Sequence, residues 1–249
     1  MGRMLLSELL KIKRSRPLKR ACIIYMALVL LSTAGAQYQS GIMGPFAALS
    51  CLVPWSYWVI AAFSALMLGG EFDGKLFKNA FACGVGREKL YAVKVLTIYL
   101  VGFFLYIAAV LTITVVLTAR FGFNPGGLAY EDYWLKVFAY NGLGLAVMFA
   151  YVSLFNLLCF VFRCSGIPFI LGVAITLVDT VSTLMTIKFY GYLKGLPKNL
   201  FSVIMLMDKE QRSLDILNPN FLGMYIPCLC VTGTALIAGY VLFKARDAE

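Results

Sequence analysis

Long stretches without charged side chains dominate this chain, and they predict helices that cross a membrane. They run over 21–70, 95–119, 137–162 and 216–243, and over 164–187, where Asp179 is the one exception. A helix needs about 20 apolar residues to cross the hydrocarbon core of a bilayer. The runs are continuously apolar rather than alternating, which favours membrane helices over a β-barrel.

The first of these stretches is long enough for two spans. Its middle, "GAQYQSGIMGP" at 35–45, holds glycines, a proline and polar side chains that favour a turn. We therefore predict an all-α membrane protein with one transmembrane domain over 1–249. Its six transmembrane helices are expected at 21–36, 47–69, 94–118, 137–162, 167–187 and 221–243.

The first twenty residues follow another pattern, with an apolar face surrounded by basic side chains. Met4, Leu5, Leu9 and Ile12 fall near one face of a helix. This is typical of an amphipathic helix lying in the membrane interface, predicted here over 1–19, and Pro17 can break it. The "STAGA" sequence at 32–36 leaves a cleaved signal peptide open as an alternative.

Charge then predicts the orientation in the membrane. The chain is 61% hydrophobic with a net charge of +10, and its mean hydropathy of +0.84 excludes an ordinary soluble domain. Seven basic residues lie in 1–20 and five in 69–94, whereas none separates the first two spans. Since basic residues stay on the cytoplasmic side, both termini are expected in the cytoplasm and the 188–220 connection outside. Basic residues spread along loops argue against nucleic-acid binding.

Residues that would carry catalysis are scarce in this composition. Histidine is absent from the chain, which removes the usual haem ligand and the histidine of nucleophilic triads. "GGEFDGKL" is not a phosphate-binding loop, because Leu76 stands where a hydroxyl should bind magnesium. The seven cysteines lack zinc-ligand spacing and suit apolar packing. We expect a chain that is not an enzyme and binds no metal or cofactor.

The densest mixed-charge segment, 71–90, lies between the second and third spans. Leu76, Ala80 and Phe81 can share one face of a helix with Phe72 at its start, which predicts an amphipathic cytoplasmic helix about three turns long. Gly84 and Gly86 permit a sharp reversal after it, because glycine tolerates a positive φ.

This segment, "EFDGKLFKNAFACGVGREKLYAVK", resembles the cytoplasmic coupling segment of type 2 ABC transporter permeases. It is most similar to small bacterial permeases for bacteriocin or lantibiotic immunity and peptide export. One departure is that Gly74 lies one position early and "KL" replaces the expected Gly-Thr step. The residues that match the family in order and spacing are Glu71, Phe72, Lys78, Asn79, Gly84, Arg87, Tyr91 and Lys94.

The resemblance implies the membrane half of an exporter in a bacterial plasma membrane. Two copies of a separate ABC ATPase would bind ATP and Mg²⁺, and a second permease, identical or related, would complete a dimer. The cargo would be a hydrophobic or cationic peptide or another amphiphile. The candidates for contact with the ATPase, or for bracing that contact, are Glu71, Phe72, Lys78, Asn79, Arg87 and Lys89.

Two alternatives to this interpretation remain open. The charges of 71–90 can simply solvate a loop, with Arg87 and Glu71 forming an ion pair that holds the reversal. A protein from another class also fits, namely a membrane immunity or sensor protein that binds a toxin or partner in the bilayer without transporting it.

Polar residues recur along one face of the fifth span, at Thr176, Asp179, Thr183 and Thr186, with Thr180 beside them. A lone carboxylate in lipid costs at least ~2.5 kcal/mol, so this stripe is expected to face protein or water. It can line the transport path, lie in the permease dimer interface, or form hydrogen bonds between helices.

Small residues also recur every four positions in two spans, which lets helices approach closely. This spacing predicts tight packing within the chain or dimerisation. The residues are Ala61, Ala65 and Gly69 in the second span and Gly142, Ala146 and Ala150 in the fourth.

Overall fold

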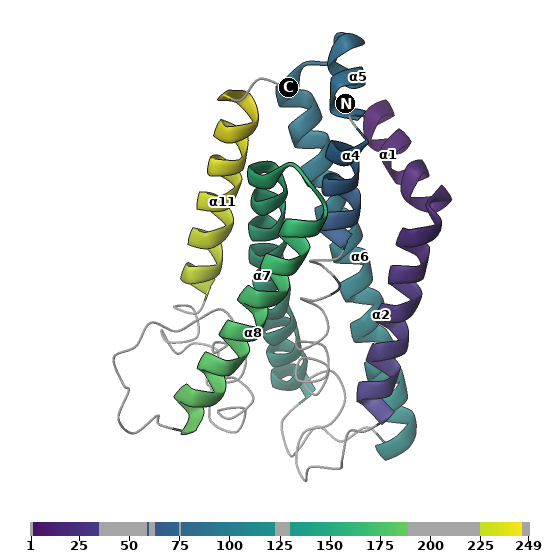
Figure 1. Ribbon diagram of the computed structural model, residues 1–249. Helices are drawn as coiled ribbons and strands as arrows, with labels where there is room; N and C mark the ends of the chain where they lie inside the picture. Colours follow the sequence, from purple (N-terminus) through teal and green to yellow (C-terminus); the bar gives the residue numbers. More distant parts are fainter. Residues whose placement is uncertain are drawn as a thin grey trace.

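The computed structural model describes residues 2–34, 59, 63–74, 76–122, 130–188 and 225–245. Every regular element within these ranges is helical, and no strand occurs among them. The helices stand side by side as a bundle, and Figure 1 shows both chain ends and the short helices α4 and α5 at the same end. The prediction of an all-helical chain is confirmed for the described residues.

The basic head forms a helix of its own and bends into the next. Helix α1 spans Gly2–Arg14 and α2 spans Arg16–Ala34. The bend coincides with Pro17 in the first turn of α2, since proline has no N–H to continue the hydrogen bonding of α1. One face of α2, with Tyr25, Val29 and Thr33, is buried in contact with α6.

Helix α6, Arg87–Phe121, is longer than the membrane is thick. Its 35 residues correspond to about 50 Å, against about 30 Å for the hydrocarbon core. Gly122 ends it with a φ of 76°, a conformation open to glycine. Helix α6 therefore extends beyond the hydrocarbon, and its first turns lie beside α4 and α5 (Figure 1).

Helix α7, Tyr130–Phe162, is the centre of the described bundle. It packs against α6, against α8 at Gly166–Lys188, and most extensively against α11 at Tyr225–Ala245. Its fully buried large side chains include Leu143, Tyr151 and Phe155. Helix α7 thus joins α6, α8 and α11, whereas α1 and α2 pack on α6.

Three of the described helices are long and apolar enough to cross a membrane, at Arg87–Arg120, Val137–Phe162 and Tyr225–Ala245. They contain or largely overlap the predicted spans 94–118, 137–162 and 221–243. Helices α2 and α8 occupy the positions of the first and fifth predicted spans. Most of the 47–69 span and nearly all of the 188–220 connection lie outside the described residues. The number of six spans thus stays a prediction.

The charged segment is divided into short pieces rather than one helix of three turns. A π-helical turn, η1 at Ala65–Gly69, leads into α4 at Gly70–Asp73, and α5 follows at Leu76–Ala82. The seven residues of α5 make two turns. Gly84 ends the segment with a φ of 76°, donating from its N–H to the Phe81 carbonyl. The positive φ expected at the reversal is thus found at Gly84, whereas Gly86, the other glycine predicted there, has a φ of −62°.

Candidate functional site

A buried lysine at the start of α6 connects three elements of the end that carries both termini. Lys94 donates to Glu8 of α1 at 2.5 Å and to Glu71 of α4. Its ammonium also lies 5.9 Å from the ring centre of Phe77 in α5. The side chains of Lys94 and Glu8 are only 5% and 8% exposed. One cation therefore connects α1, α4 and α5 to a membrane helix.

Lys11 completes this group, which we call the charged cluster: Glu8, Lys11, Glu71 and Lys94. The ammonium of Lys11 lies 2.7 Å from Glu8 and 3.6 Å from Glu71. Two cations and two carboxylates balance one another. A buried charge needs such compensation, because removing it from water otherwise costs several kcal/mol.

The surroundings of Glu8 shift its pKa. Burial alone raises the pKa of Glu8, but hydrogen bonds from Lys11 and Lys94 outweigh burial and hold the pKa below its ordinary value of 4.5. Burial lowers the pKa of Lys11, and the hydrogen bond to Glu8 and the charge of Glu71 outweigh it and raise that pKa above 10.5. Glu8 and Lys11 are therefore both charged near neutral pH.

Replacing Glu8 with Gln is expected to destabilise the chain at pH 7 and to have less effect in acid. The carboxylate contributes stability above the unfolded pKa of 4.5, and this contribution is lost as pH falls through the lower folded pKa. Thermal unfolding of the purified chain between pH 7 and pH ~3.5 measures the difference. Glu88→Gln, at a side chain that is 64% exposed, is the control. A gap between wild type and Glu8→Gln that stays constant with pH would contradict the assignment.

A group of aromatic rings fixes α4 and α5 onto the membrane helices. Phe72 stacks on Phe77 at 4.4 Å between ring centres, and Phe77 meets Phe243 of α11 edge to face at 5.7 Å. Phe160 of α7 and Tyr91 of α6 contact the same Phe243 ring. Such pairs contribute about 0.5–1.5 kcal/mol each beyond burial. The aromatic group therefore packs α4 and α5 against residues of α6, α7 and α11.

Polar contacts connect the charged segment to two further places in the bundle. Asp73 accepts hydrogen bonds from the Ser165 hydroxyl at 2.6 Å and from its N–H at 3.2 Å, in the turn between α7 and α8. Arg87 donates to the Lys244 carbonyl at the end of α11 at 3.2 Å. Glu88 accepts from Tyr240 and pairs with Lys244. The stretch from α4 to the first turn of α6 thus contacts the turn between α7 and α8 and the end of α11.

The inward and outward faces of α5 differ from the predicted ones. Phe77 is buried with 4% of its surface exposed, whereas Leu76 is 47% exposed. The prediction grouped Leu76 with Ala80 and Phe81 on one apolar face, but Leu76 is exposed whereas Ala80 and Phe81 are half-buried. The turn at Gly74 ends α4, so the face that contains Phe72 does not continue in register into α5.

The residues predicted to contact or brace an ATPase have different surroundings. Glu71 and Phe72 are internal, in the charged cluster and the aromatic group. The Arg87–Glu71 pair considered as an alternative is replaced by other contacts, since Glu71 binds Lys94 and Arg87 lies over Phe81. Lys89 is exposed in the first turn of α6. Lys78 and Asn79 belong to α5, and their side chains lie outside the description.

Sequence reasoning missed Glu8 and Phe77. Glu8 is the only acidic residue among the first twenty, and a single carboxylate in a basic amphipathic helix is a signal that could have been used. Lys94 was singled out only as part of a motif, although it opens an apolar span. A lysine in that position needs a nearby anion.

The polar stripe predicted in the fifth span belongs to α8. The side chains of Thr176, Asp179, Thr180 and Thr183 lie outside the description, so a role in a transport path or dimer interface stays a prediction.

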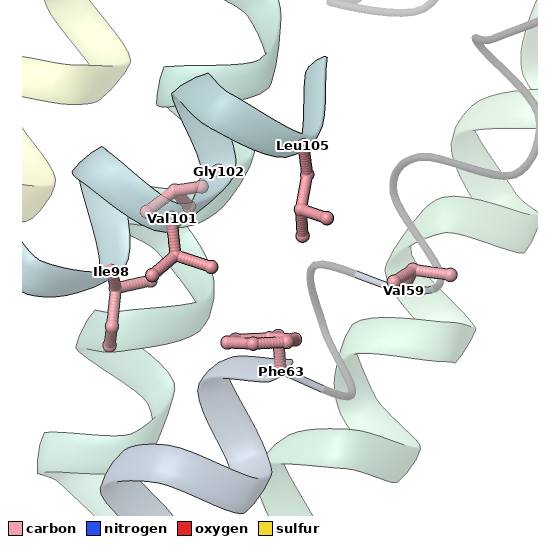
Figure 2. Close-up of a pocket in the computed structure, with 7 residues that line it drawn as sticks. Val59, Phe63, Ile98, Val101, Gly102 and Leu105 are labelled. Carbon is pink, nitrogen blue, oxygen red and sulfur yellow. The ribbon is translucent and has the colours of Figure 1, made fainter. Parts of the chain in front are cut away.

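A pocket occurs elsewhere, between the residues before η1 and α6 (Figure 2). Its lining is wholly apolar and consists of Val59, Phe63, Ile98, Val101, Gly102, Leu105 and Val152.

The small-residue positions are used for packing within the chain where they are described. A side chain at Gly69 would place its Cβ 2.5 Å from the Ser165 Cα, and one at Gly142 would meet the Tyr225 hydroxyl at 3.2 Å. Ala65 and Ala150 are buried. Of the two uses predicted, close packing within the subunit accounts for these positions.

The structure is that of a helical membrane subunit in which the charged segment packs against the ends of the membrane helices. Residues 4–182, more than half of the chain, match the model of a family described as ABC-2 family transporter protein. The chain belongs to this family, as its resemblance to type 2 permeases predicted. It is a multi-pass membrane subunit of an ABC transporter, and the family implies association with an ABC ATPase. A search of curated proteins gave no match.

Proposed function

We propose that this chain is the permease subunit of an ATP-driven exporter, and that α5 receives the movement of a separate ATPase. The observation that carries the proposal is the contrast between the two sides of α5. Phe77 holds the helix against the bundle, while Leu76 is left 47% exposed beside it. An exposed large apolar side chain on a firmly held helix suits contact with a partner protein.

The contacts of α5 make it suitable for transmitting force. A push on α5 would reach α6 through Lys94 and α11 through Phe243, because Phe77 touches both. Two ATPase copies binding ATP and Mg²⁺, and a second permease of the same or a related sequence, complete the proposed transporter. Glu71 and Phe72 then brace the contact, whereas Lys78, Asn79, Arg87 and Lys89 are candidates for the contact itself or its rim.

The proposed cargo is a hydrophobic or cationic peptide or another amphiphile, exported across a bacterial plasma membrane. This part of the proposal rests on the resemblance to peptide-export and immunity permeases. In the same scheme both termini and α5 lie in the cytoplasm. Their common end in the bundle (Figure 1) is compatible with that arrangement.

Replacing Leu76 with Asp is expected to weaken binding of the ATPase and to abolish its stimulation by the permease. A carboxylate in an apolar contact must give up its hydration, so a loss of tenfold or more in affinity is expected. Leu76→Met, which keeps an apolar side chain of similar size, is the matched control.

Charge reversal at Lys78 or Arg87 is expected to uncouple ATP hydrolysis from efflux while leaving membrane insertion intact.

The measurement is co-purification of the chain with a co-expressed ABC ATPase from the same source, followed by ATP turnover with and without the permease. Normal binding and turnover with Leu76→Asp would reject α5 as the contact. A purified chain that never retains an ATPase would instead favour the non-transporting immunity or sensor protein.

A further inference from the structure

The outward face of α2 begins with cations and continues as an apolar stripe. Arg16 and Arg20 are followed at helical spacing by Ile23, Ala27 and Leu31, and all five are exposed. Ile23 and Leu31 are 68% and 71% exposed. In a membrane protein this stripe faces lipid, because the opposite face of α2 is buried against α6.

At the end of α1 the order is reversed, so that exposed apolar side chains come first and the cations follow them. Leu6 and Leu10 are exposed and lie two turns and one turn, respectively, before Lys13 and Arg14, which are exposed as well. Helices α1 and α2 meet at a bend on the outside of the bundle in Figure 1. We call the cations at this bend the basic elbow: Lys13, Arg14, Arg16, Lys19 and Arg20.

The charges of the basic elbow differ from those of the charged cluster. Lys11 and Lys94 have carboxylates within 4 Å. None of the five elbow cations has an ion-pair partner among the described residues. The first turn of α2 also lacks an acidic residue. The elbow is therefore a concentrated positive surface at the level where the lipid-facing stripe begins.

We infer that the basic elbow binds the phosphate of an anionic phospholipid whose acyl chains lie along Ile23, Ala27 and Leu31. Cations near a membrane surface attract anionic headgroups. The apolar stripe directly below the cations provides a surface for the chains, which a free phosphate ion would not use. This inference rests on the membrane character of the family and not on the proposed coupling to an ATPase.

The test uses the purified full-length chain without an ATPase. The chain is equilibrated in detergent micelles that contain equal amounts of phosphatidylglycerol and phosphatidylcholine, and the lipids it retains are counted by native mass spectrometry. Wild type is expected to retain phosphatidylglycerol preferentially. The double variant Arg16→Gln/Arg20→Gln removes two of the elbow cations and is expected to reduce this preference about thirtyfold. Lys89→Gln/Lys136→Gln, which removes two cations outside the elbow, is expected to keep it.

Two further arms use the wild-type chain, so the result does not depend on the folding of a variant. Raising the salt concentration is expected to reduce the preference for phosphatidylglycerol, because exposed charges are screened. Inorganic phosphate at constant ionic strength is expected to leave it unchanged. Equal retention by wild type and the elbow variant, a preference insensitive to salt, or displacement of the lipid by inorganic phosphate would each overturn the inference.

Discussion

Replacing Lys94 with Met is expected to lower the free energy of unfolding by about 3–5 kcal/mol. The substitution leaves the carboxylates of Glu8 and Glu71 close together without the cation that both now contact. Lys11 cannot compensate fully, since its side chain is 58% exposed and lies 3.6 Å from Glu71. Denaturant unfolding of the purified chain measures the change, and limited proteolysis of the first twenty residues reports release of α1.

Two controls separate this effect from a general sensitivity of α6. Lys89→Met removes a cation from an exposed position in the same helix and is expected to change stability by less than about 0.5 kcal/mol. The triple variant Glu8→Gln/Glu71→Gln/Lys94→Met is expected to recover part of the loss, because it no longer contains unpaired buried carboxylates. A triple variant that is less stable than Lys94→Met alone would show that charge compensation is not the main role of Lys94.

Replacing Gly69 with Ala is expected to be the second large change, with a loss of about 1–3 kcal/mol. The added Cβ would lie 2.5 Å from the Ser165 Cα and 2.7 Å from the Cys164 carbonyl oxygen. Both are backbone atoms, so a side-chain rotation cannot relieve the overlap. The turn between α7 and α8 must move away from η1, which also strains the hydrogen bonds between Ser165 and Asp73.

Gly70→Ala is the matched control, because it lies one residue further in the same helical run. No atom lies within 4 Å of a Cβ added at Gly70. Alanine in a helix loses less conformational freedom than glycine, so this variant is expected to be unchanged or up to ~1 kcal/mol more stable. Thermal unfolding of the two variants in parallel measures the difference, and equal stability would contradict the close packing assigned to Gly69.

Helix α5 marks the limit of what helical periodicity can predict. The periodic reading joined Phe72, Leu76, Ala80 and Phe81 into one face, and that requires a continuous helix. Gly74 ends α4 before Leu76 begins α5, so the faces of the two pieces are independent. Phe77 is then drawn inward by the Phe72 and Phe243 rings, which lie in separate elements and outside any local pattern.

The sequence by itself determined the helical class, the runs long enough to cross a membrane, the reversal at Gly84 and the transporter family. These depend on local properties, namely the thickness of hydrocarbon that an apolar run must match and the φ that glycine tolerates. Only the tertiary structure decided that Glu8 and Glu71 share Lys94 and that Leu76 faces outward. Residues 1–20 offer seven cations and residues 69–94 five more, and their order in the chain does not determine which meets which carboxylate. The packing of α1 and α4 on α6 makes that choice, because only a pairing within reach can compensate a buried charge.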